Sequence, residues 1–402
     1  MMIKRNIFLI LALLVVVSGA AQPKGGDSLE KFLMTYSSNF NHSLSGPILK
    51  GKLGDPMPAY DFGHGLSSKA LKGKTVVLTY WATWCGGCRL LCQDLDSVMF
   101  RHAASGDYAG VQVIGVDAGE RLVNKGYKAS TFWKEKGIHF PTTAPGKAAD
   151  NNAKAVDAGH PSTIIVDGNG IIRGRWEAWS PGVAGDVALA AWVLSDMPRK
   201  NIKADIPTAR QLLKDGHADR ALYLLEQLPA DTLRDHLRLL ALLDYSPRMA
   251  SQAFDDFVAK YRKAKNLGEG FELEDNSKEY VLAMRDFRDS VLNMTSAGAE
   301  LTERAYRAAR SVMSANQYHD AKDMVKAARL RWRYGETIQK NAASLMRQAL
   351  HQADEAKSPE AGNIRQWMKE HHVSETDKEM SASHKQILRD EQEEEHMKTV
   401  KK

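Results

Sequence analysis

The stretch Trp84–Cys88 (WCGGC) decides the interpretation of this 402-residue chain, because of what stands on either side of it. Just before it, Thr75–Trp81 (TVVLTYW) is a short run of apolar and β-branched residues, typical of a buried β-strand. After it, residues Gly86 to Ala104 carry apolar positions at helical spacing. The two cysteines are therefore predicted to lie where a strand ends and a helix begins.

The spacing of the two cysteines favours redox chemistry. Cysteines at positions i and i+3 on a first helical turn bring their side chains onto one face, where a disulfide can open and close without a large backbone movement. At a helix N-terminus, unpaired N–H groups and the dipole lower a thiol pKa from about 8.5 to roughly 3.5–7.5. We therefore predict Cys85 as the attacking thiol, and Cys88, one turn further in and less exposed, as the resolving thiol.

The region around these cysteines mixes strands, turns and short helices. Asp167–Gly170 (DGNG) reads as a tight turn between two strands. This order of elements predicts an α/β domain with a mixed central sheet flanked by helices. Its other predicted elements are strands at Gly110–Val116, Ser162–Val166 and Ile171–Trp176, and helices at Ser130–Lys136 and Ala184–Leu194.

Three segments resemble thioredoxin-fold proteins. Trp81–Arg89 (WATWCGGCR) resembles their active site, and the closest match is the exported TlpA/ResA-like family of thiol-disulfide oxidoreductases. Gly54–Phe62 (GDPMPAYDF) resembles the N-terminal segment of that family's domain, and Gly159–Asp167 (GHPSTIIVD) resembles the segment that holds a cis-proline opposite the CxxC. The resemblance covers about residues 52–200 and implies a thioredoxin-like fold for them.

The resemblance also implies a site. Pro161 would be cis, and His160 would offer backbone groups to a bound substrate strand. A redox-active Cys85–Cys88 disulfide would carry the chemistry, so we expect no separate cofactor and no metal. The residues expected to bind substrate are Trp84, Gly86, Gly87, His160 and Pro161.

The chain departs from the family pattern in places that concern proton transfer. Thioredoxin itself has a buried acidic residue where this chain has Thr79. Exported relatives often carry a Glu and a Pro at the positions of Leu91 and Gln93. Proton transfer to Cys88 therefore has no obvious side chain, and water is an open alternative.

Two further residues have open roles. The imidazole of His160 either stabilises the Cys85 thiolate or moves its proton, or it is a surface residue with no role. Cys92 is expected to be a buried core residue rather than a third thiol of a relay. A metal site of Cys85, Cys88 and Cys92 would need a fourth ligand, and the preceding strand favours redox work instead.

The N-terminus has the order of a secretory signal peptide, with Lys4 and Arg5, then the apolar run Ile7–Val17, then small residues at Ser18–Ala21. The apolar run is about half of the ~20 residues that span a bilayer, so an uncleaved anchor is the less favoured alternative. We therefore expect export to the periplasm or cell envelope, where disulfides can form.

From about Asp205 onward the strand signal disappears, and Ala, Leu, Arg, Lys and Glu recur at helical spacing. Apolar stripes at 209–213 and 221–225, broken at Gly216, are loosely matched at 309–328. This predicts an all-α domain of helical-hairpin repeats or an irregular helical bundle. The expected segments are a signal peptide (1–21), an N-terminal extension (22–51), a thioredoxin-like domain (52–200), a helical domain (201–375) and a charged tail (376–402).

Composition excludes several classes of protein. Apolar residues make up 43% and charged residues 26%, as in globular proteins, and three cysteines are too few for a disulfide scaffold. The net charge of +6 is small and no basic patch interleaves with aromatics, so no nucleic-acid partner is expected.

Three functions are consistent with the sequence. The first is an exported oxidoreductase that reduces disulfides of envelope proteins and is recharged by a membrane thiol electron donor. The second is a partner-binding or scaffold protein that carries a thioredoxin fold, which retention of both cysteines and Trp84 disfavours. The third is peroxide reduction, which is weakened because Leu78 and Ala82 stand where peroxiredoxins have Pro and Thr. The sequence leaves redox direction and oligomeric state open.

Overall fold

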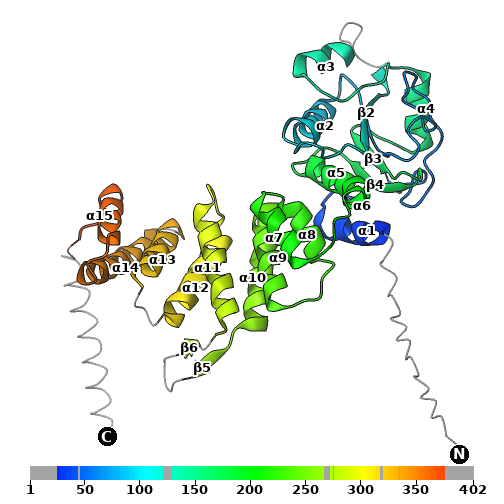
Figure 1. Ribbon diagram of the computed structural model, residues 1–402. Helices are drawn as coiled ribbons and strands as arrows, with labels where there is room; N and C mark the ends of the chain where they lie inside the picture. The colour runs from blue at the N-terminus through cyan, green and yellow to red at the C-terminus, as the bar shows by residue number, and fades with distance from the viewer. Residues whose placement is uncertain are drawn as a thin grey trace, which may run out of the picture. The chain divides into compact units, whose positions relative to one another are not determined.

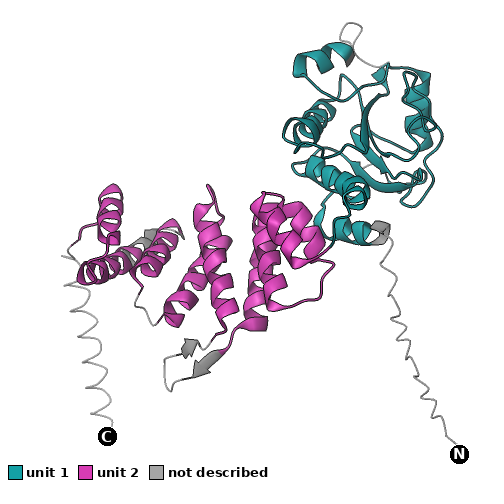
Figure 2. Ribbon diagram, in the orientation of Figure 1, with its two compact units in different colours: residues 1–203 teal, residues 204–402 magenta. Residues whose placement is uncertain are grey.

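The computed structural model describes residues 25–43, 46–120, 129–266, 272–274, 276–316, 320–334 and 336–375. The chain divides into two compact units, unit 1 (Met1–Lys203) and unit 2 (Ala204–Lys402) (Figure 2). This division falls close to the domain boundary expected after residue 200. The predicted signal peptide, residues 1–21, and the predicted charged tail, residues 376–402, lie outside the described residues.

Unit 1 is built around a four-stranded mixed sheet with the strand order β2-β1-β3-β4 (Figure 1). β1 pairs in parallel with β2 and antiparallel with β3, which pairs antiparallel with β4. The mixed central sheet expected from the sequence is confirmed. The strands are β1 (Thr75–Trp81), β2 (Val111–Asp117), β3 (Ser162–Val166) and β4 (Ile172–Glu177).

The central strand β1 is buried along all seven residues. On one face, Leu78 packs in a cluster with Ala153 of helix α4 (Lys147–Ala155). Alternate residues of β1 point to the other face, where helices α2 (Gly86–Asp96) and α5 (Val183–Ala191) contact the strand. A strand covered on both faces has a continuous apolar run rather than an alternating one, which explains why TVVLTYW could be recognised.

Helices continue and flank these elements. Single π-helical turns extend α2 and α5, so the helical patterns predicted for 86–104 and 184–194 are longer than the regular helices. The sequence patterns did not predict α4, whose segment KAADNNAKA is polar; Asn152 fixes it by accepting a hydrogen bond from the Tyr80 hydroxyl at 2.8 Å. Further helical segments are α1 (Gly25–Tyr36), η1 (Ser97–Arg101), α3 (Ala129–Lys136), η3 (Trp192–Asp196) and α6 (Met197–Arg199).

The N-terminal extension packs onto unit 1 through helix α1, which contacts β4. Leu29 and Leu33 on α1 are completely buried. Phe40 forms an isolated β-bridge with Trp176, and their ring centroids lie 5.3 Å apart. The Trp176 indole N–H also donates to the Ser37 hydroxyl at 3.1 Å. Residues before position 52 therefore contribute to the core of unit 1.

Unit 2 is an array of helices in which contacts follow the chain order (Figure 1). Successive helices contact each other from α7 to α10 and from α11 to α15, and contacts of α9 with α11 and of α10 with α12 join the two runs. Stacked helical hairpins produce this order of contacts. The helices are α7 (Ile206–Lys214), α8 (Ala218–Leu225), α9 (Thr232–Tyr245), α10 (Pro247–Tyr261), α11 (Lys278–Asn293), α12 (Ala299–Ala315), α13 (Ala321–Tyr334), α14 (Glu336–Glu355) and α15 (Glu360–Glu370).

One feature of unit 2 departs from the all-helical expectation. Between α10 and α11, the short strands β5 (Ala264–Asn266) and β6 (Glu272–Glu274) pair antiparallel. Strands of three residues are too short to produce the alternation by which a strand is recognised. The hairpin therefore had no signal in the sequence.

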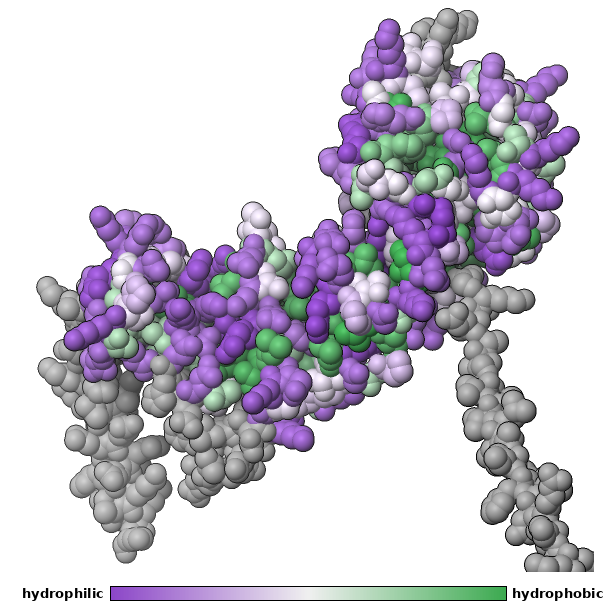
Figure 3. Space-filling view, in the orientation of Figure 1, coloured by the Kyte–Doolittle hydropathy of each residue, from purple (hydrophilic) through white to green (hydrophobic). Residues whose placement is uncertain are grey.

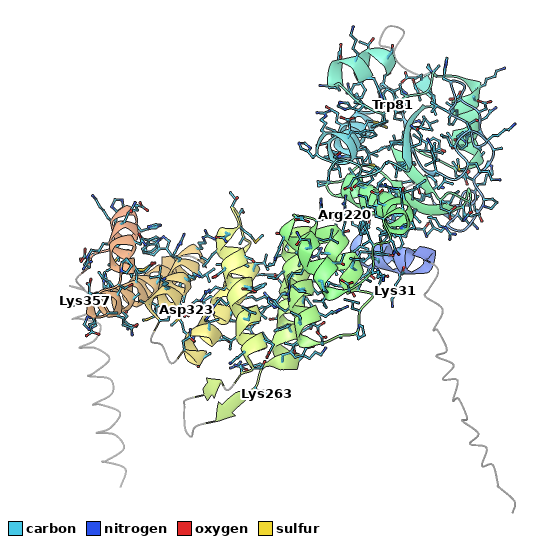
Figure 4. All side chains as sticks on the ribbon, in the orientation of Figure 1. Lys31, Trp81, Arg220, Lys263, Asp323 and Lys357 are labelled. Carbon is cyan, nitrogen blue, oxygen red and sulfur yellow. A yellow bond between two sulfur atoms is a disulfide. The ribbon has the colours of Figure 1, made fainter. Side chains whose placement is uncertain are left out.

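A buried ion pair connects helices of unit 2. Arg288 on α11 is completely buried, and its guanidinium donates to Asp323 on α13 at 2.5 Å and to Asp289 at 2.7 Å. Asp323 is labelled in Figure 4. Asn316, at the C-terminal end of α12, donates to the other oxygen of Asp323 at 2.7 Å. A buried charge is tolerated only with such partners, so this network fixes how α11, α12 and α13 pack.

The outer surface of unit 2 is mostly hydrophilic on the face shown in Figure 3, with apolar side chains in smaller groups. Within the described ranges, no helix is both long enough and apolar enough to cross a bilayer.

We predict that a chain ending at Lys203 stays folded without unit 2. The sheet and its apolar cluster, from Leu71 to Ile172, lie within unit 1. Circular dichroism and urea unfolding of the shortened protein should show a cooperative transition, and a protein of residues 204–402 serves as the matched counterpart. An insoluble product, or the loss of cooperative unfolding, would contradict this prediction.

Candidate active site

Cys85 and Cys88 lie where β1 leads into α2. Cys85 is the N-cap residue of α2 with an extended backbone (φ −87°, ψ 107°), and Cys88 lies in the first turn. The two form a disulfide with an S–S distance of 2.09 Å and a Cα–Cα distance of 5.2 Å. The backbone N–H of Cys88 donates a hydrogen bond to the Cys85 sulfur at 3.2 Å.

The two cysteines differ in exposure. Cys85 is 8% exposed, whereas Cys88 is completely buried behind it. The N–H of Cys88 and the N-terminus of α2 are both directed at the Cys85 sulfur, and both would stabilise a thiolate there after reduction. This asymmetry favours the sequence-based prediction that Cys85 attacks and Cys88 resolves.

The peptide bond between His160 and Pro161 is cis, as the family resemblance implied. Pro161 is buried and lies beside the CxxC spacer: a Cβ added at Gly87 would lie 3.7 Å from its Cδ. A Cβ at Gly86 would meet nothing within 4 Å. The two spacer glycines are therefore in different surroundings, since Gly87 faces the cis-proline and Gly86 faces open space.

A second tryptophan, Trp179, borders the spacer and was missed by the sequence analysis. A Cβ at Gly87 would lie 3.6 Å from the Trp179 Cβ. The Trp179 indole N–H donates to the Asp94 carboxylate on α2 at 2.8 Å, which holds the ring in place. Trp179 lies in the loop after β4, far from the cysteines in sequence, so no local motif indicated it.

Trp84 and His160 lie on one side of the site, with ring centroids 5.5 Å apart. Trp84 is 37% exposed, and its indole N–H donates to the Gly119 carbonyl at 3.1 Å. His160 is half-buried, and its Nε2 lies 2.8 Å from the Ala118 carbonyl oxygen, which makes Nε2 the protonated nitrogen. The imidazole thus joins the cis-proline loop to the end of β2, a role that the sequence analysis did not propose.

The segment that follows β2 receives hydrogen bonds from both sides of the site. Besides the bonds to Ala118 and Gly119, the Glu120 carboxylate accepts the backbone N–H of Thr83 and, at 2.7 Å, the Thr83 hydroxyl. The Gly119 N–H in turn donates to Asp150 on α4 at 2.9 Å. This segment therefore positions the residues that precede Cys85 and those that precede Pro161.

Asp117, the last residue of β2, is a buried carboxyl beside this segment. It is completely buried, and neither carboxylate oxygen has a hydrogen-bond partner among the described residues. Burial, and then the charges of Glu120 and Asp150, raise the pKa of Asp117 to about 8. The signal that could have identified it is an acidic residue closing an apolar strand, directly opposite Trp81 in the parallel pair.

Of the three positions at which the chain departs from the family pattern, Thr79 and Leu91 lie in the core, whereas Gln93 is half-buried. Thr79 is buried and its hydroxyl accepts a hydrogen bond from the Thr163 hydroxyl at 3.2 Å. Leu91 is buried, and Cys92 is a completely buried free thiol whose pKa is raised by burial. The predicted core position of Cys92 is confirmed. In the part of the chain that the structure describes, no group of three His, Cys, Asp or Glu side chains is arranged to hold a metal ion.

Comparisons with known proteins agree with this geometry. Residues 52–178 match the Redoxin family. The thiol:disulfide interchange protein DsbE of Haemophilus influenzae is 27% identical over 152 residues, 36% of this chain and 74% of that protein. The thiol-disulfide oxidoreductase ResA of Bacillus subtilis is 27% identical over 112 residues, which cover 27% of this chain and 55% of ResA.

One solved structure aligns with part of this chain. A thiol:disulfide interchange protein from Chlorobium tepidum aligns with a TM-score of 0.28 and 23% identity, covering 35% of this chain and 94% of that one.

We predict that Cys85 is the fast-reacting thiol of the reduced protein and that Cys92 is unreactive. Iodoacetamide titration should show one fast thiol with a pKa below about 8, because it lies at the N-terminus of α2. Peptide mapping should place the label on Cys85, and Cys92 should react only in denaturant. The prediction fails if Cys85→Ser keeps the fast phase, or if Cys92→Ala removes it.

We also predict that Asp117 makes the stability of unit 1 depend on pH. Between about pH 4 and pH 8 the folded protein holds a proton on Asp117 that the unfolded chain releases. Raising the pH through this range should therefore lower the free energy of unfolding, by up to about 1.4 kcal/mol per pH unit. Asp117→Asn, which cannot ionise, should reduce this slope in urea unfolding of the full chain. An unchanged slope would show that Asp117 is not the group responsible.

Proposed function

Since residues 52–178 belong to the TlpA/ResA-like thiol-disulfide oxidoreductases, we propose that this chain is an exported enzyme that reduces disulfides of cell-envelope proteins. The observation that carries the proposal is the asymmetry of the cysteine pair. Cys85, at the N-cap of α2, keeps 8% of its surface exposed, whereas Cys88 in the first turn keeps none. A substrate disulfide can approach Cys85 but not Cys88. This arrangement suits a two-step exchange, in which Cys85 attacks the substrate and Cys88 then resolves the mixed disulfide.

The reaction starts from the reduced protein. The Cys85 thiolate attacks one sulfur of the substrate disulfide; the substrate S–S bond breaks, a mixed disulfide forms, and the other substrate sulfur leaves as a thiolate. Cys88, as its thiolate, then attacks the Cys85 sulfur, which closes the Cys85–Cys88 disulfide and releases the second substrate thiolate. Both released thiolates take up protons, so the substrate gains two electrons and the protein loses two.

The surroundings of Cys85 suit an extended protein segment as substrate. Trp84 offers an exposed aromatic face, and Pro161 and Trp179 border the Gly87 side of the disulfide. Because proline has no N–H, Pro161 leaves its neighbour His160 to offer the backbone groups that a substrate strand would pair with. We assign substrate binding to this surface, which includes Trp84, Gly86, Gly87, His160 and Pro161.

The proposal also covers the electron donor, the cellular location and the role of unit 2. We propose that a membrane thiol electron donor reduces the Cys85–Cys88 disulfide after each turnover, and that no further cofactor takes part. The relatives named DsbE and ResA support the general chemistry, while export rests on the signal-peptide pattern of residues 1–21. Unit 2 then has the role of recognising a partner, because stacked helical arrays provide extended binding surfaces.

We predict that the mature protein catalyses the reduction of insulin by dithiothreitol, and that Cys85→Ser abolishes this activity. In Cys88→Ser the mixed disulfide cannot be resolved, so disulfide-linked partner proteins should accumulate on Cys85 in an envelope extract. The Cys85→Ser/Cys88→Ser double variant is the matched control and should trap nothing. Absence of insulin reduction would exclude the proposed function, and peroxide consumption in its place would favour an antioxidant role.

A further inference from the structure

We propose that Glu120 is a positioning residue for the Cys85–Cys88 reaction, and that the buried carboxyl of Asp117 helps to keep it in place by staying neutral. Glu120 fixes the turn that leads into Cys85. While Asp117 is neutral, the Glu120 carboxylate is not repelled by a second buried negative charge. The inference rests on the proposed function only in that it concerns the same pair of cysteines.

Two hydrogen bonds join Glu120 to Thr83, in the turn that leads into Cys85. Both of its carboxylate oxygens are used by Thr83: one accepts the backbone N–H, and the other accepts the hydroxyl at 2.7 Å. Thr83 is buried and stands two residues before Cys85. The Cys85 N–H donates to the Ala82 carbonyl at 3.1 Å and closes a turn around Thr83. Holding Thr83 at two atoms therefore sets the direction in which the chain enters the N-cap of α2.

The bonds from Glu120 are of the strong kind only while it is ionised. A carboxylate that accepts an N–H and an O–H forms charge-assisted hydrogen bonds, which are roughly twice as strong as neutral ones. A protonated Glu120 would have one oxygen less to offer as an acceptor. The positioning of Thr83 thus depends on Glu120 keeping its negative charge.

The surroundings of Asp117 favour the neutral form of its carboxyl group. Three carboxyl groups face one another here: Asp117 on β2, Glu120 just after it, and Asp150 on α4, which accepts the Gly119 N–H. On the neighbouring segment, Nε2 of His160 is hydrogen-bonded to the Ala118 carbonyl. Asp117 is completely buried and has no hydrogen-bond donor among the described residues. It is therefore the member of the group that is neutral most readily.

Loss of this proton would act on the active site. Once Asp117 ionises, two buried like charges repel and the Glu120–Thr83 bonds weaken, so the turn before Cys85 loosens. Burial and the charges of Glu120 and Asp150 raise the pKa of Asp117 to about 8, which places the change within the range where thiol reactions are measured. The reaction of Cys85 should then fall again as pH rises through this value.

The test uses the full-length reduced protein and a small disulfide, glutathione disulfide, as the probe. The second-order rate constant is measured from pH 5 to pH 10, and the reduction potential of the pair by equilibration with dithiothreitol. Wild type should show a rate that rises as Cys85 ionises and descends above about pH 8. In Asp117→Asn and in Glu120→Gln the descending limb should be absent, because only one member of the Asp117–Glu120 pair can then carry a charge.

A second comparison separates geometry from charge. Glu120→Gln keeps an amide oxygen for the Thr83 N–H but loses the charge, so its rate at pH 7 should fall below that of wild type, though less than the rate of Glu120→Ala. Glu120→Ala removes both bonds, so its rate should fall roughly tenfold or more, as misplacement of a reacting group does. Asp61→Asn alters an exposed carboxylate outside the site, whose Oδ1 accepts the Gly63 N–H, and should reproduce the wild-type profile.

Two results would overturn the inference. A Glu120→Ala protein that reacts at the wild-type rate and has the wild-type potential would exclude positioning by Glu120. A descending limb that persists in Asp117→Asn would exclude Asp117 as the proton carrier, and this comparison decides even if Glu120→Ala fails to fold. Because the probe is a small disulfide, failure of insulin reduction would exclude the proposed function while leaving this test intact.

Discussion

The active site depends on the parallel pairing of β1 and β2. The register places Asp117 opposite Trp81, so both strands end at the same edge of the sheet. The chain after β2 then runs beside the turn that leads into Cys85, and its carbonyl and carboxylate oxygens accept hydrogen bonds there. Without this pairing neither Trp84 nor His160 would find the acceptors that hold it.

Those contacts also show how a short motif becomes a site. The four residues of the CxxC supply both sulfurs and the helix N-terminus that favours a thiolate. The direction from which a substrate reaches Cys85 is set by other segments, the loops of Pro161 and Trp179. The chemistry is therefore local in sequence, whereas the access to it depends on two segments that lie far along the chain from the cysteines.

The features that could be predicted from the sequence are those that depend on residues close together in the chain. β1 was recognised because burial on both faces requires a continuous apolar run, and the cysteines because their spacing is itself the chemistry. Glu120 and Trp179 act through partners 37 and 85 residues away, at Thr83 and Asp94, and no spacing motif along the chain indicates such contacts.

Helix α4 and the β5–β6 hairpin were not predicted because of their composition and their length. Helix α4 is polar and rich in Asn and Ala, and the strands of the β5–β6 hairpin have three residues each. Neither gives an apolar period long enough to detect. His160 was considered as a partner of the thiolate, but the structure binds its Nε2 to a backbone carbonyl, an acceptor that no side-chain pattern reveals.

The chain-order contacts of unit 2 have a consequence for how that half of the protein can change over time. Where each helix rests mainly on those next to it, stability accumulates hairpin by hairpin rather than through one shared centre. The last two helices of the described residues, α14 and α15, can then be lost, duplicated or replaced while α7–α10 keep their own neighbours. Length becomes an adjustable property of unit 2, and its reach can evolve in steps of one hairpin.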